Sequence, residues 1–156
     1  MPGVEIKRGT ARVLPVDRDG RVLLLIGREL LRRGDHFWLS VGGGIERGES
    51  LVQAAARELR EETGISVDPA ALGSAIGTSV LEFTSFGLLS VIQHQTYYAL
   101  AVAGTGVSFA GQGAVERLTI VGYEWLSADG LAARPERVND PELPRLMRAA
   151  VAAVRS

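Results

Sequence analysis

The sequence predicts a mixed α/β sandwich, in which a β-sheet lies between α-helices. Three observations lead to this prediction. Short apolar runs typical of strands occur in both halves of the 156-residue chain, a carboxylate-rich helix lies between them, and an amphipathic helix ends the chain. The length suits one domain with its own core, so residues 1–156 are expected to form a single domain.

The amino-acid composition excludes some classes of function. The hydrophobic fraction of 46% and the charged fraction of 22% are ordinary for a soluble globular protein. Seventeen basic residues face eighteen acidic ones without a basic run, so neither nucleic acid nor a membrane is expected as a partner. The lack of cysteine excludes disulfides, thiolate metal sites and a cysteine nucleophile. No apolar run reaches bilayer-spanning length and no signal peptide is recognisable, so we expect a cytoplasmic protein.

The first third of the chain predicts two strands and a loop. Thr10–Val16 is a strand pattern in which Pro15 indicates a sheet edge or a bulge. Asp17–Gly20 is a turn signal, and Arg21–Gly27 is a buried strand that returns antiparallel to the first. The glycine run Gly42–Gly44 is predicted to be a loop, because glycine is unfavourable in regular structure.

A helix is predicted from Leu51 to Glu62, where strong helix formers follow one another without proline or glycine. Ser50 and Gln53 have the spacing of a capping box, and Gly64 suits the position after the helix C-terminus. The helix is expected to pack through aliphatic residues on one side, which are Val52, Ala55, Ala56 and Leu59.

The second half predicts mainly strands. Val67–Leu72 resembles a loop, and strand patterns follow around Ser79–Phe83, Leu88–Val102 and Thr119–Ser127. A helix from about Pro144 ends the chain. Strands, helix, strands and helix in this order are typical of the mixed sandwich.

Three carboxylates of the helix predicted from Leu51 to Glu62 are candidate metal ligands. Glu58, Glu61 and Glu62 stand at i, i+3 and i+4, so they lie on one face of the helix. Without a cation these charges would repel one another. Because Mg²⁺ prefers carboxylate oxygens together with phosphate oxygens, the spacing predicts a divalent-metal site for phosphate chemistry.

From Gly43 to Ile65 the sequence reads G-x5-E-x7-R-E-U-x-E-E-x-G-U, where U is aliphatic. The fixed positions are Gly43, Glu49, Arg57, Glu58, Leu59, Glu61, Glu62, Gly64 and Ile65. This pattern resembles the Nudix box, and every fixed position of that box is filled. The resemblance implies the Nudix fold, a mixed β-sheet sandwiched between α-helices, and Mg²⁺- or Mn²⁺-dependent hydrolysis of a pyrophosphate bond in a nucleoside diphosphate linked to another moiety.

The resemblance also implies roles for single residues. Glu58 and Glu62 would be the principal metal ligands, Glu61 a further or water-mediated ligand, and the carbonyl of Gly43 an additional one. The loop Gly42–Gly44 would approach the substrate. Arg57 would hold that loop to the helix by pairing with Glu49 or Glu46, so Arg57→Lys should be harmful because the forked geometry is lost.

The general base is left open between two glutamates. In the family it is a box glutamate, here Glu58, or a glutamate of a later loop, here Glu116. Glu124, in a strand pattern, ranks below both. Val41 stands where the family often has proline, which predicts a change in loop stiffness without loss of the metal ligands.

The substrate expected by default is a (d)NTP or a related small nucleotide, as in the MutT-like group. Alternatives are a hydrolase of ADP-ribose or nucleotide sugars, and a Nudix-fold sensor or regulator without turnover. The complete box argues against the sensor, and the missing cysteine argues against isopentenyl-diphosphate isomerase chemistry. A homodimer is compatible with the family.

Other polar and aromatic residues are expected to have structural roles. Histidines are poor candidates for a magnesium-type site, and aromatic side chains are more often buried than used for base stacking. A solvated loop is the expected place of the arginines. These residues are His36, His94, Phe83, Phe86, Tyr97, Tyr98, Arg28, Arg32 and Arg33.

Overall fold

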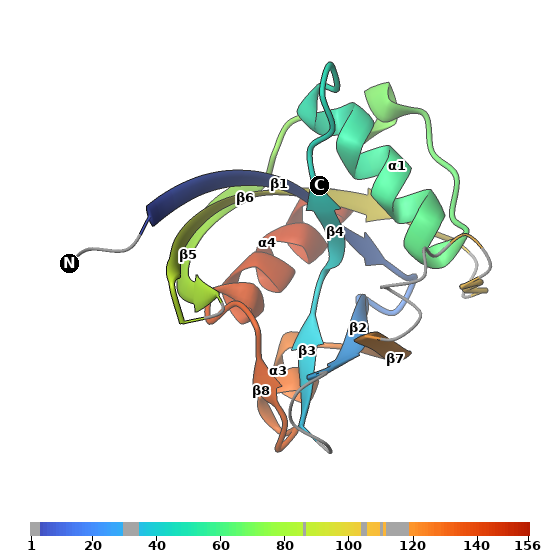
Figure 1. The fold of residues 1–156 in the computed structure, drawn as a ribbon. Helices are drawn as coiled ribbons and strands as arrows, with labels where there is room; N and C mark the ends of the chain where they lie inside the picture. The colour runs from blue at the N-terminus through green and yellow to red at the C-terminus, as the bar shows by residue number, and fades with distance from the viewer. Residues whose placement is uncertain (1–3, 30–34, 86, 104–105, 110, 112–118) are drawn as a thin grey trace.

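The computed structural model describes residues 4–29, 35–85, 87–103, 106–109, 111 and 119–156 (Figure 1). The strands are β1 (Val4–Val16), β2 (Val22–Arg28), β3 (His36–Leu39), β4 (Val41–Gly44), β5 (Gly77–Ser85), β6 (Leu89–Ala101), β7 (Ile120–Leu126) and β8 (Arg137–Val138). The helices are α1 (Leu51–Thr63), the 3₁₀ helix η1 (Pro69–Leu72), α3 (Ala128–Ala132) and α4 (Leu143–Arg155).

The strands in the described part form one eight-stranded sheet with the order β5-β6-β1-β2-β3-β8. Two further strands branch from this path, because β4 pairs with β1 and β7 pairs with β2. β1 runs parallel to β6 along its whole length, and β3 runs parallel to β8. All other recorded strand pairs are antiparallel, so the sheet is mixed, as predicted.

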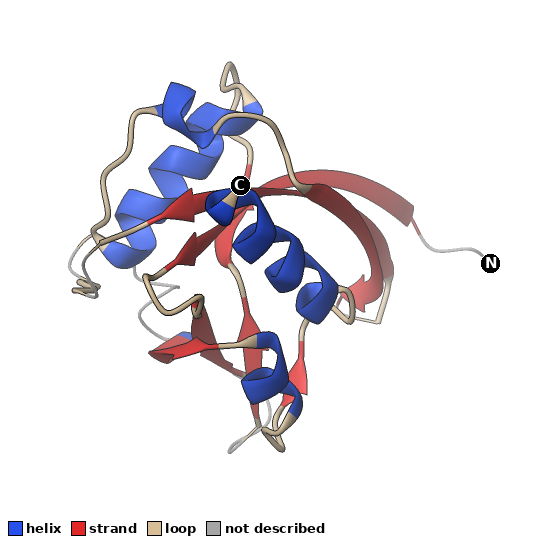
Figure 2. Ribbon diagram, turned by 180° about the vertical axis from the view of Figure 1, so that it is seen from behind, coloured by secondary structure: helices blue, strands red, loops and turns tan. Residues whose placement is uncertain are grey.

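Helices cover both faces of the sheet. α1 buries its alanines and Leu59 against one cluster that includes Val13, Leu23 and Val41. α4 buries Leu146 and Met147 against a second cluster on the other face. Figures 1 and 2, seen from opposite sides, show α1 in front of the sheet in the first view and α4 in front in the second. No helix in the described part is long and apolar enough to cross a membrane.

The predicted loop at Gly42–Gly44 is wrong, because these residues belong to strand β4 and pair with β1. The glycines permit this pairing at very short range. A Cβ atom on Gly42, which has a φ of 145°, would lie 2.3 Å from the carbonyl oxygen of Ala11. The strand therefore depends on glycine for its close approach and on β1 for its hydrogen bonds.

Two smaller differences concern loops and edges. Pro15 lies between the residues of β1 that pair with β4 and Val16, which pairs with β2. On that side Pro15 has no recorded strand partner, which is where a residue without an N–H fits. The predicted loop Val67–Leu72 contains η1, which Asp68 caps by accepting a hydrogen bond from the N–H of Ala70.

Candidate active site

Both ends of α1 are fixed by hydrogen bonds that the sequence predicts. The Ser50 hydroxyl accepts from the N–H of Gln53 at 3.2 Å, and the Gln53 side chain accepts from the N–H of Ser50 at 2.9 Å. Gly64 ends the helix with a φ of 78°, a conformation that favours glycine. The predicted helix and its capping box are confirmed. The acidic side chains therefore project from a rigid element.

Arg57 joins this helix to the glycine strand. Its guanidinium binds both carboxylate oxygens of Glu49, at 2.7 and 2.9 Å, and donates to the carbonyl oxygen of Gly44 at 2.9 Å. Glu46 lies farther away, at 3.6 Å. Hydrogen bonding from Arg57 lowers the pKa of Glu49, and the same bond raises the pKa of Arg57. Glu49 is thus the main partner of the two that were predicted.

Arg57 also contacts the acidic face, which the sequence did not predict. Its Nη1 lies 3.1 Å from Glu58 Oε1 and 3.2 Å from Glu61 Oε2. One guanidinium therefore fixes the loop glutamate and two of the three helix glutamates. The Arg57 side chain is only 15% exposed, so solvent screens these contacts little.

Glu58 and Glu62 form a buried carboxylate pair beside the glycine strand. They are 9% and 5% exposed, and Glu62 Oε1 accepts from the N–H of Gly42 at 3.3 Å. Burial raises the pKa of Glu62 well above its usual range, and the neighbouring Glu58 carboxyl raises it further. A Cβ on Gly43 would lie 2.6 Å from Glu58 Oε1, so any other residue there would displace this carboxylate from its position.

The pair has the chemistry that a hard divalent cation needs. All available ligands are oxygens, and two buried carboxylates that repel each other gain from a shared cation. Among the described residues, no group of three acidic, histidine or cysteine side chains is gathered closely enough to hold a metal ion. The third glutamate, Glu61, has a side chain that is 37% exposed, whereas Glu58 and Glu62 are buried. Glu58 and Glu62 therefore fit the cation best.

Of the two later glutamates that were candidates for the general base, the structure describes Glu124 and not Glu116. Glu116 lies outside the described residues, so its predicted part as general base stays a prediction. Glu124 lies on β7 opposite Leu24 of β2 and is paired with Arg134. Its carboxylate is thus held by an arginine away from the acidic face of α1.

A cleft of about 740 Å³ is lined mainly by residues of β1, β3, β5, β6 and β8. Its lining combines aromatic, aliphatic, charged and amide side chains, which are Arg12, Glu29, Phe37, Leu39, Leu81, Glu82, Phe83, Thr84, Gln93, Arg137 and Asn139. Phe83 was expected to be structural, but it lines this cleft and is 44% exposed. Arg137 lies 4.6 Å from the centre of the Phe37 ring and pairs with Glu29. The cleft has the size of a small-molecule site.

A buried hydrogen-bond network supports one wall of this cleft. Asp140 Oδ2 accepts from Ser79 at 2.5 Å and from Gln95 and Tyr97 at 2.8 Å each. Because a carboxylate only accepts, the amide group of Gln95 is turned with Nε2 toward Asp140 and Oε1 toward Gln93. Gln93 donates to that oxygen at 2.9 Å. Burial and the nearby Asp140 charge raise the pKa of Tyr97.

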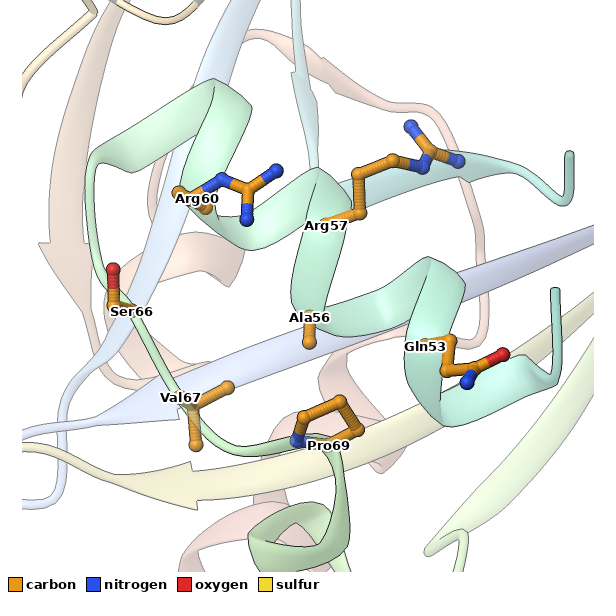
Figure 3. Close-up of a pocket in the computed structure, with 7 residues that line it drawn as sticks. All are labelled: Gln53, Ala56, Arg57, Arg60, Ser66, Val67 and Pro69. Atoms are coloured by element: carbon orange, nitrogen blue, oxygen red, sulfur yellow. The ribbon is translucent and has the colours of Figure 1, made fainter.

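A smaller hollow of about 270 Å³ lies between α1 and the segment that follows it (Figure 3). Its lining includes Gln53, Ala56, Arg60, Val67 and Pro69, and none of the three helix glutamates. Arg57 contributes to the wall, but Figure 3 shows its guanidinium pointing away from Val67 and Pro69. This hollow is therefore separate from the carboxylate pair.

The remaining candidates divide into core and surface. Tyr97 and Tyr98 are buried, as predicted, and His36 and His94 are exposed on strands. Arg28 ends β2, whereas Phe86, Arg32 and Arg33 lie outside the described residues. The sequence reasoning missed Arg12, a buried arginine that lines the cleft, and Asp140. Only the alternation of β1 could have pointed to Arg12, since it places that residue on the same side as Leu14.

Comparisons with known proteins agree with this geometry. The sequence profile of the NUDIX domain matches residues 6–147. The dihydroneopterin triphosphate diphosphatase of Escherichia coli K12 is 36% identical over 110 residues, which cover 67% of this chain and 70% of that protein. Matches to an octanoyltransferase of Myxococcus xanthus (41% identical, 45% of this chain) and to the putative mutator protein MutT4 of Mycobacterium tuberculosis (52%, 31%) span about a fifth of those proteins, 21% and 19%.

Solved structures match nearly the whole chain. The E. coli dihydroneopterin triphosphate pyrophosphohydrolase has a TM-score of 0.66 at 25% identity and covers 95% of this chain and 99% of its own. A MutT protein from Methanosarcina mazei has a TM-score of 0.64 at 21% identity, with 97% and 98% covered. The predicted sandwich of helices around a mixed sheet is confirmed. The chain therefore belongs to the NUDIX domain family and has the fold of its hydrolases.

Proposed function

We propose that this protein is a metal-dependent pyrophosphohydrolase that acts on a nucleoside diphosphate linked to another moiety, with a (d)NTP or a related triphosphate as substrate. The observation that carries the proposal is the buried pair Glu58 and Glu62, held by Arg57 and Gly42. The charge of Arg12 interacts with this pair, and Arg12 is part of the lining of the 740 Å³ cleft. Family membership and the named relatives support hydrolysis of a pyrophosphate bond.

Glu58 and Glu62 would hold a Mg²⁺ or Mn²⁺ ion, together with the carbonyl oxygen of Gly43 and with Glu61 directly or through water. When bound, such an ion neutralises phosphate charge and lowers the pKa of a coordinated water. Arg57 keeps the Glu58 carboxylate in place, and the N–H of Gly42 does the same for Glu62. These contacts preorganise the site before substrate arrives.

Hydrolysis needs a water molecule to attack one phosphorus atom of the anhydride. The new P–O bond forms as the bridging P–O bond breaks, and the other phosphate group leaves with the bridging oxygen. A carboxylate must take the proton of the water, and Glu58 and Glu116 remain the two candidates. Single substitutions of each to glutamine, followed by pH–rate profiles, would assign the role.

The names of the relatives add substrates to the panel of compounds to be tested. The E. coli relative is named for a pterin triphosphate, so the panel contains dihydroneopterin triphosphate beside the (d)NTPs. ADP-ribose and nucleotide sugars test the alternative hydrolase class. A sensor without turnover would bind a panel member and release no product.

The test measures phosphate and pyrophosphate release with Mg²⁺ or Mn²⁺ and identifies both products. We expect turnover of at least one triphosphate, which stops when EDTA removes the metal. Glu62→Gln should abolish it, and Glu142→Gln, at an exposed glutamate paired with Arg145, should keep it. Wild-type protein that releases no product from any panel member would contradict the proposal.

A further inference from the structure

Arg12 is a buried arginine at the border between the cleft and the carboxylate pair. It lies on β1, where it pairs with Tyr97 of β6 on one side and with Gly42 of β4 on the other. Only 7% of the residue is exposed, yet it belongs to the lining of the 740 Å³ cleft. Its positive charge interacts with Glu62 and Glu58. Arg12 thus lines the cleft and carries a charge that interacts with the carboxylate pair.

The guanidinium is held in place mainly by backbone oxygens. Nη1 donates to the carbonyls of Ser40 and Gly42, at 3.2 Å each, and Nε lies 3.4 Å from the hydroxyl of Thr10. Gly42 makes this position available, because a Cβ there would lie 2.7 Å from Arg12 Cδ. The side chain is therefore fixed by the strand that also orients Glu62.

The other terminal nitrogen, Nη2, is free for a ligand. Within the described ranges no hydrogen bond from Nη2 is recorded, and no carboxylate lies within 4.0 Å of Arg12 as an ion pair. In the described part, the only side-chain nitrogen or oxygen atoms that are fully buried without a hydrogen-bond partner are the indole nitrogens of Trp38 and Trp125. Nη2 of Arg12 is not among them. An arginine carries five N–H donors, so Nη2 has donors to offer to a ligand in the cleft that Arg12 lines.

A buried cation without an ion pair is unfavourable unless an anion joins it. Burial lowers the pKa of Arg12, as does the positive charge of Arg8, whereas Tyr97, Glu62 and Glu58 raise it. A guanidinium nevertheless stays protonated at neutral pH. The position therefore provides a fixed, desolvated positive charge, and such a charge binds a phosphate oxygen through a short charge-assisted hydrogen bond.

We propose that Arg12 forms a metal-independent phosphate subsite, in which Nη2 binds the phosphate group that joins the substrate's organic moiety in the cleft to the anhydride that is cleaved. This inference rests on the proposed function for the identity of the ligand. The cleft receives the organic moiety, Arg12 binds the first phosphate, and the cleaved bond lies beyond it toward Glu58 and Glu62. Arg12 is then a residue that determines which phosphates of the substrate lie beside Glu58 and Glu62.

The subsite is tested by binding without metal. In EDTA, we compare guanosine with GMP and adenosine with AMP by calorimetry, and add inorganic phosphate as a competitor. Wild type should bind at least one monophosphate about tenfold to a hundredfold more tightly than its nucleoside, the gain expected from a charge-assisted hydrogen bond. Inorganic phosphate should displace that monophosphate. Equal affinities within both pairs, or no binding of either monophosphate at millimolar concentration, would overturn the subsite.

Two variants and one matched control locate the effect. Arg12→Gln should remove the difference in affinity between monophosphate and nucleoside. Arg12→Lys keeps the charge and should retain part of this difference. It is the variant to measure if the glutamine variant does not fold. Lys7→Gln removes an exposed cation of the same strand that is not among the charges acting on Arg12, and it should keep the full difference. A full difference in either folded Arg12 variant would assign the phosphate to another group.

These outcomes are separable from those of the proposed function. Turnover with Mg²⁺ together with equal metal-free affinities would overturn the subsite and leave the hydrolase standing. A clear monophosphate preference that depends on Arg12, without turnover of any panel member, would support the subsite and contradict hydrolysis. With turnover established, Arg12→Lys is expected to raise KM more than it lowers kcat, since the phosphate contact forms before the reaction.

Discussion

Replacing Arg57 by lysine tests how the helix and the glycine strand are joined. Arginine makes three close contacts there, two to Glu49 at 2.7 and 2.9 Å and one to the carbonyl of Gly44 at 2.9 Å. A lysine ammonium is a single point with three donors, and it cannot bind a carboxylate through two parallel bonds while also reaching the carbonyl. We expect the variant to lose two of these three contacts.

The magnitude follows from the strength of each contact. A hydrogen bond to a charged group contributes about 1.5–3 kcal/mol. The Arg57 side chain is 15% exposed, so part of the loss is recovered through water, and we expect a decrease of about 2–3 kcal/mol in the free energy of unfolding. For a domain of this size that corresponds to a decrease in Tm of about 4–12 °C.

Thermal unfolding followed by circular dichroism in metal-free buffer measures this change. Arg60→Lys is the matched control, because Arg60 lies on the same helix three positions later, is exposed and has no ion pair among those recorded for the described residues. The control should unfold within about 0.5 kcal/mol of wild type. An Arg57→Lys protein as stable as that control would refute the idea that the forked contact joins helix and strand.

Three further predictions concern buried carboxylates and their surroundings. Because Glu62 holds its proton more tightly in the folded state, wild-type stability in metal-free buffer should fall as pH rises above 4.5, and Glu62→Gln should lack this fall in a Tm series. Gly43→Ala places a Cβ 2.6 Å from Glu58 Oε1 and should lower kcat at least about tenfold, whereas Gly44→Ala should be milder in the same assay. Asp140→Ala removes the acceptor of three buried hydrogen bonds and should cost about 2–4 kcal/mol in urea unfolding.

Local signals explain why the helix region could be predicted. The capping box of Ser50 and Gln53, the glycine stop at Gly64 and the Arg57–Glu49 pair all involve residues at most eight positions apart. Their energetics depend on spacing along one helix, which the sequence shows directly. The boundaries of the predicted strands also differ from the structure by only one or two residues, apart from the early start of β1 at Val4.

Long-range pairing explains what could not be predicted. β1 pairs with β6 across most of the chain, so that Thr10 and Arg12 come beside Gln95 and Tyr97. No local sequence pattern predicts that Asp140 accepts a hydrogen bond from Ser79, which lies 61 positions away in the chain. The strand at Gly42–Gly44 was missed for a related reason: its stability comes from the partner strand and not from its own residues.

The most direct measurement follows hydrolysis in ¹⁸O-labelled water by ³¹P NMR, with wild type and Glu62→Gln compared on the triphosphate that the panel identifies. We expect that wild type with Mg²⁺ places one ¹⁸O in a single product phosphate, and that Glu62→Gln forms no product above the uncatalysed rate. Wild type that is no faster than Glu62→Gln on every substrate would contradict a carboxylate-based metal hydrolase at this site.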